Sequence, residues 1–134
     1  MALKHRVNIV NDFTLPVGAA ALNKGDVVKI TSSLAVVATA STAAFIGVTT
    51  ESADASAPSI RIAGPGSIVL CIAHDSAITE GEWVVPALLG RVDGIATLTT
   101  ATQYVVGISL MASSAAGQLI PVLLIPFIAV KAAS

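Results

Sequence analysis

Apolar residues are grouped along this chain in short runs rich in Val and Ile. The runs occupy residues 27–30, 44–48, 67–73, 83–85, 104–110 and 119–130. Runs of this length and composition are typical of β-strands. Turn-forming residues separate them at 23–26, 63–66, 79–82 and 92–94. Many short strands with turn signals between them predict a β-barrel or a β-sandwich.

Two local features refine this prediction. The sequence Gly64-Pro65-Gly66 predicts a tight hairpin turn between the strands on either side of it. The stretches 35–44 and 112–116 are rich in Ala, the best helix former. They also contain Ser and Thr and show no apolar stripe at a 3.6-residue period, so we expect at most one short helix.

The chain contains an internal repeat. The first copy has Gly25-Asp26-Val27-Val28, then Phe45-Ile46-Gly47-Val48, then Ile60-Arg61-Ile62. The second copy has Gly81-Glu82-Trp83-Val84, then Val105-Val106-Gly107-Ile108, then Ile120-Pro121-Val122. Each copy is too small to bury a core alone, so we expect residues 25–62 and 81–122 to form two similar β units packed into one domain.

Composition limits the possible function classes. Hydrophobic residues make up 54% of the 134 residues and charged residues only 11%, against roughly 25% in an average soluble domain. The apolar run 119–130 is interrupted by two prolines and is shorter than the roughly 20 residues of a membrane-spanning helix, so we expect no membrane partner. The basic residues are scattered and the net charge is −1, which argues against direct binding of nucleic acid. A surface with so few charges is typical of a subunit that partners cover.

These motifs, together with the segment Val7-Asn8-Ile9-Val10-Asn11-Asp12-Phe13, resemble the capsid decoration, or cement, proteins of tailed bacteriophages. Many members of that family are catalogued only as a domain of unknown function. The resemblance covers roughly residues 7–125, although family members usually have Tyr where this chain has Trp83. It implies a compact, tulip-like β domain on the outside of the virion capsid, often a homotrimer, that clamps neighbouring major capsid proteins together.

We expect residues 1–15 to be an N-terminal extension and residues 16–134 to be a single β domain. The extension carries the clustered basic residues and is a natural contact arm, which can add a strand from Val7 to Val10 to a neighbouring sheet edge. Trp is enriched at binding hot spots, although burial in the core is its more usual role. The predicted capsid or subunit contacts are Lys4, Arg6, Val7, Ile9, Phe13 and Trp83.

Catalytic and metal-binding patterns are weak. His74-Asp75 with Ser76 or Ser67 contains the residue types of a triad, but the sequence has no Gly-x-Ser-x-Gly elbow, and a polar turn explains residues 74–76 more simply. Two His and one Cys, far apart, give no metal-ligand spacing, so we expect no metal or cofactor. Cys71 lies in an apolar run and is predicted to be a buried, inert thiol.

The sequence therefore predicts a structural virion protein and not an enzyme. Two alternatives share the all-β prediction. One is an adhesion or carbohydrate-binding module, although sugar sites usually present stacked aromatic residues and the five aromatic residues here are spread out. The other is a structural component of the tail or baseplate, which composition does not separate from a head protein.

Overall fold

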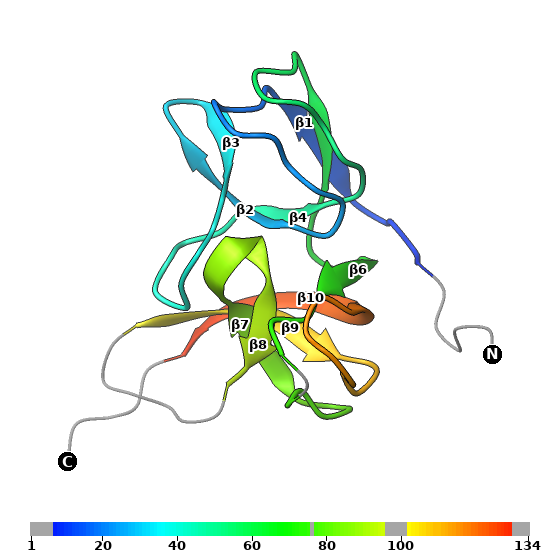
Figure 1. Ribbon diagram of the computed structural model, residues 1–134. Helices are drawn as coiled ribbons and strands as arrows, with labels where there is room; N and C mark the ends of the chain where they lie inside the picture. The colour runs from blue at the N-terminus through cyan, green and yellow to red at the C-terminus, as the bar shows by residue number, and fades with distance from the viewer. Residues whose placement is uncertain (1–6, 76, 96–101, 130–134) are drawn as a thin grey trace.

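The computed structural model describes residues 7–75, 77–95 and 102–129 (Figure 1). One antiparallel sheet contains β1 (Asp12–Leu15), β2 (Val27–Thr31), β3 (Leu34–Val37), β4 (Gly47–Thr49) and β5 (Ile60–Ala63). The other contains β6 (Ile68–Ile72), β7 (Trp83–Pro86), β8 (Val92–Gly94), β9 (Gln103–Ser109) and β10 (Leu119–Ala129). Within these ranges the only helical element is the 3-10 turn η1 (Leu88–Gly90). The predicted all-β fold of two similar units is confirmed.

The two sheets have the same topology. The strand order is β1-β5-β4-β2-β3 in the first and β6-β10-β9-β7-β8 in the second, so β1 corresponds to β6, β2 to β7, and so on. The register repeats as well. Val27 lies opposite Val48 in the first sheet. Trp83 lies opposite Ile108 at the equivalent place in the second. The sequence repeat is therefore a repeat of structure.

The structural repeat begins closer to the N-terminus than the sequence motifs indicated. Phe13 lies opposite Ile62 in β1 and β5. Val69 occupies the equivalent position opposite Val122 in β6 and β10. The last four residues of segment 1–15 are thus a strand of the first sheet.

The predicted hairpin at Gly64-Pro65-Gly66 is wrong. β5 pairs with β1 and β4, whereas β6 pairs with β10, so this turn connects the two sheets. Gly66 has a φ of 86° and donates its N–H to the carbonyl of Leu124, and Leu124 donates in turn to Ser67. These two hydrogen bonds tie the connection to β10, the strand with which β6 pairs.

Each sheet has a core built from equivalent residues. The first unit buries Val17, Leu22, Val28, Ala35, Ile60 and Ile62 in one cluster. The second unit buries their counterparts Ala73, Ile78, Val84, Val92, Ile120 and Val122 in another. A parallel β-bridge joins Val17 to Ala35 in the first unit, and an equivalent bridge joins Ala73 to Val92 in the second. Each bridge connects the segment that follows one edge strand to the opposite edge strand of the same sheet. Both units therefore fold around the same inner face.

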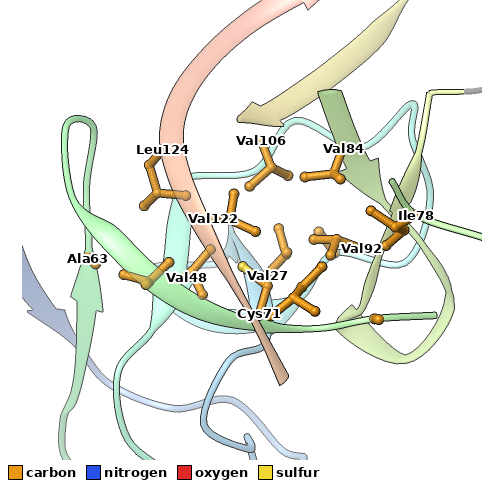
Figure 2. Packing of buried hydrophobic residues seen from close by; sticks show 14 residues of the cluster. Val27, Val48, Ala63, Cys71, Ile78, Val84, Val92, Val106, Val122 and Leu124 are labelled. Carbon is orange, nitrogen blue, oxygen red and sulfur yellow. The ribbon is translucent and has the colours of Figure 1, made fainter. Parts of the chain in front are cut away.

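A second set of apolar residues joins the two units. Val27, Val48 and Ala63 lie side by side across β2, β4 and β5, and we call them the first outer row. All three are fully buried and belong to the same cluster as the core of the second unit (Figure 2). The outer face of the first unit is therefore buried together with the core residues of the second unit.

The repeated glycine of each middle strand has a steric cause. A Cβ atom on Gly107 would overlap the backbone carbonyl of Leu123, and one on Gly47 would overlap that of Ala63. Backbone atoms cannot swing away as a flexible side chain does. Only glycine therefore permits this close approach of neighbouring strands.

We predict that Gly107→Ala and Gly47→Ala each lower the free energy of unfolding by about 2–3 kcal/mol, because the added methyl group forces β9 or β4 away from its neighbour. Urea denaturation of each variant measures this. The exposed Ala112→Ser serves as the matched control and should leave stability unchanged. Equal stability of the glycine variants and the control would contradict the close approach.

Cys71 is a free thiol inside the second core. Burial raises its pKa to about 12, so at neutral pH almost none of it is the reactive thiolate. We predict that a disulfide reagent such as Ellman's modifies Cys71 only after the protein is unfolded in guanidinium. Rapid modification of the native protein at pH values near neutrality would show that the second core is open to solvent.

Candidate interaction surface

The second sheet presents an apolar row on its outer face. Trp83 lies opposite Ile108 and Ile108 lies opposite Leu123, so the row crosses β7, β9 and β10. We call these three residues the second outer row, because they are equivalent to the first outer row. All three are only partly buried in the chain. Apolar side chains lined up across a half-exposed face mark a surface fit for a partner.

Phe127 extends the second outer row. Its ring meets the indole of Trp83 edge to face, with ring centroids 4.8 Å apart, and 40% of the residue is exposed. Phe127 follows a register shift in β10 between Leu124 and Phe127. Such an irregularity re-aims the side chains that follow it. The pair forms a rigid aromatic anchor of the kind found at binding hot spots.

The N-terminal segment runs along the edge of the second sheet. Asn8 exchanges backbone hydrogen bonds with Ile68 of β6, with N···O distances of 2.9 and 2.8 Å. At Asn8 the segment therefore pairs with its own chain. Ile9 packs against the second core, whereas Val7 is 49% exposed. Val7 and Ile9 line one shallow groove together with Lys24.

The structure brings some of the predicted contact residues together and separates others. Val7 and Ile9 share their groove. Phe13 lies on β1 of the first sheet and is 38% exposed, while Trp83 lies on β7 of the second. Lys4 and Arg6 lie outside the described residues. The sequence analysis missed Ile108, Leu123 and Phe127. Ile108 belongs to the repeated Val-Gly-Ile motif, and this makes it equivalent to the buried Val48.

Two of the residues considered for a triad, Asp75 and Ser67, make structural contacts. The Asp75 carboxylate accepts the N–H of Ala77 at 2.9 Å, which is a turn contact. The Ser67 hydroxyl accepts the N–H of Val10 and donates to the carbonyl of Asn11, so it holds the N-terminal segment in place. Ser76 lies outside the described residues.

In the described part of the chain, no group of three or more His, Cys, Asp or Glu side chains is placed to hold a metal ion. The same residues form no helix long and apolar enough to cross a membrane.

Asp26 is the buried carboxylate of the first unit, at the turn that leads into β2. One carboxylate oxygen accepts the N–H of Asn23 at 2.8 Å, and the other is buried without a hydrogen-bond partner in the structure. Desolvation raises the pKa of Asp26 above its ordinary value of 3.8, although the Asn23 hydrogen bond and the charge of Arg91 oppose the shift. Glu82 accepts the Thr79 N–H at the equivalent turn, where it is more exposed.

This raised pKa predicts a pH dependence of stability. A carboxyl whose pKa is higher in the folded state favours folding when neutral, and that contribution is lost as pH rises through the folded pKa. We predict that the native protein gains stability relative to Asp26→Asn as pH falls from 7 to about 4. Urea midpoints across this range measure the difference. A pH-independent gap between the native protein and Asp26→Asn would contradict the desolvation.

A scan against models of known protein families and a search of curated proteins both found no match for this chain. Function is therefore inferred from the surface described above and from the sequence resemblance.

Proposed function

We propose that this chain is a structural protein that decorates the outer surface of a tailed-phage capsid and stabilises it by clamping neighbouring major capsid proteins, as a homotrimer on the virion. The sequence resemblance suggests the capsid as the partner. One observation of the structure supports a binding role: the second outer row and Phe127 form an apolar surface on a sheet. A sheet face that is exposed only to water usually carries polar side chains.

The proposed mechanism needs no chemistry. A protein that binds across several capsid subunits, and binds single subunits poorly, adds its binding free energy only to the intact lattice. The lattice then resists internal pressure because neighbouring subunits cannot part without losing that binding. The chain contains two β units with the same topology, so a single copy has two folded units with which to contact neighbouring capsid subunits.

The N-terminal segment is the proposed contact arm. Ser67 and the Asn8–Ile68 bridge anchor the segment to the second sheet, and the exposed Val7 comes just before this anchor in the chain. Apolar and backbone contacts should dominate the binding, because only 11% of the residues are charged. Binding of this kind depends only weakly on salt.

We predict that heads lacking the protein assemble but rupture at lower temperature, and that adding the purified protein restores their resistance. The added protein should bind expanded heads and not isolated capsid subunits, measured by co-sedimentation and by heat-induced release of DNA. Deleting residues 1–7 should weaken binding without lowering the melting temperature, because the Asn8–Ile68 bridge and the packing of Ile9 remain.

Leu88→Asp is the matched control for this experiment, since Leu88 is exposed on η1 and belongs neither to the N-terminal segment nor to the strands that carry the second outer row. It should bind heads like the native protein. Equal affinity for free capsid subunits and finished heads would refute the clamp. Binding to a host glycan with none to heads would favour the adhesion module, and binding confined to tails would favour a tail component.

A further inference from the structure

The two outer rows are equivalent in the repeat but differ in burial. The first outer row is fully buried against the second unit of the same chain. The second outer row is partly exposed, and Phe127 beside it is 40% exposed. The second outer row is therefore the unused copy of a surface that already forms an interface inside the molecule.

The side chains of the two rows point to the same conclusion. Moving from the first row to the second replaces Val27 by Trp83, Val48 by Ile108, and Ala63 by Leu123. Each replacement enlarges the apolar side chain, although the second row is the more exposed. A face that only meets water gains nothing from larger apolar groups, whereas a face that a partner covers gains burial with each one.

The receiving surface of the interface also occurs twice. In the second unit, Val69, Cys71 and Val106 belong to the cluster that buries the first outer row, and they are at most 2% exposed. We call these three residues the second inner set. Their equivalents in the first unit are Phe13, Leu15 and Ile46, which we call the first inner set. Phe13 is 38% exposed, and Leu15 and Ile46 are only partly buried.

Each chain thus has one satisfied interface and two unsatisfied halves of another. The satisfied interface joins the first outer row to the second inner set. The unsatisfied halves are the second outer row and the first inner set, which lie on different units of the same chain. Because the two halves differ, they cannot satisfy each other by a two-fold, face-to-face contact.

We propose that a second copy of this chain covers the second outer row with its own first inner set, so that copies associate head to tail. The contact between copies then repeats the packing that joins the two units within each copy. Head-to-tail association closes into a ring when the rotation per copy permits it, so the oligomer that we expect is larger than a dimer. The inference concerns the free protein and does not rest on the proposed capsid function.

Two surface variants test the head-to-tail geometry. Phe127→Asp places a charge on the second outer row, and Phe13→Asp places one on the first inner set. Analytical ultracentrifugation of the full chain at micromolar concentrations should show a closed oligomer for the native protein and a monomer for each variant. An equimolar mixture of the two variants should form a one-to-one dimer and nothing larger, because one variant retains each half of a single contact. Leu88→Asp should associate like the native protein.

A second measurement separates loss of association from loss of folding. Trp83 is the only Trp of the chain, so its fluorescence reports on the second outer row. Acrylamide quenching of Trp83 should fall as the native protein is concentrated and should stay constant for Phe13→Asp, a variant on the other sheet. Circular dichroism should give β spectra and cooperative melting for both variants.

Three results would overturn the inference. A native protein that stays monomeric at all concentrations would show that copies do not associate. A mixture of the two variants that forms no dimer, although the native protein associates, would show that the contact does not join the second outer row to the first inner set. Unchanged Trp83 quenching on association would place the contact elsewhere. A monomer that still binds and protects heads would end this inference and the proposed homotrimer, but would leave the capsid-stabilising role standing. A head-to-tail oligomer that ignores heads would support this inference and refute that role.

Discussion

The burial of Val27, Val48 and Ala63 between the two sheets is the contact on which the rest of the structure depends. Each unit buries an equivalent set of inner residues, and the cluster of the second unit also includes this row from the first. The connection between the sheets is the short turn after Ala63, which fixes the end of the row directly beside β10. In a chain with so few charges, this apolar contact is the main one that joins the two units. The ion pair between Arg61 and Asp12 lies within the first unit, is exposed and contributes little.

Much of the fold could be predicted from the sequence, because the longer strands are nearly continuous apolar runs and the motifs repeat in order. The Gly in each middle strand could be recognised as part of the repeated motif. The reason for it, a backbone carbonyl of the neighbouring strand at the place that a side chain would occupy, is seen only in the structure. The strands β1, β3 and β8 were not predicted. β1 lies in the segment assigned to the N-terminal extension, most of β3 lies in an Ala-rich stretch, and β8 occupies residues 92–94, which were predicted to be a turn. The crossover at Gly64–Gly66 was missed because the same turn residues serve a hairpin and a link between sheets.

The candidate surface was predicted only in part. Trp83 could be selected from the sequence because it is the only Trp, but its partner Phe127 lies beyond a register shift that no pattern revealed. Phe13 was grouped with the N-terminal contact arm because it precedes the first strong apolar run, yet it lies in β1. The most informative feature, that one outer row is buried and its equivalent is exposed, depends on how the two units pack. A sequence repeat predicts two units of similar fold, but it does not predict that the outer row of one unit is buried and that of the other is exposed.

This unequal packing connects the fold to the proposed function. If the repeat were closed by a two-fold axis, both outer rows would be buried and the surface would offer no large apolar contact. Because the units pack asymmetrically, each chain retains an outer row and an inner set for partners, at the cost of exposed aromatic groups. A decoration protein needs such surfaces to be rigid before it binds, since ordering a flexible surface would consume part of the binding free energy.

The most direct test of the central claim is electron cryomicroscopy of heads reconstituted with the purified protein, at a resolution that separates subunits. We predict density for the protein on the outer surface, each copy touching more than one capsid subunit, with Trp83 and Phe127 covered. Heads with no added density, or density for copies that each touch a single capsid subunit and leave Trp83 and Phe127 in solvent, would contradict the account.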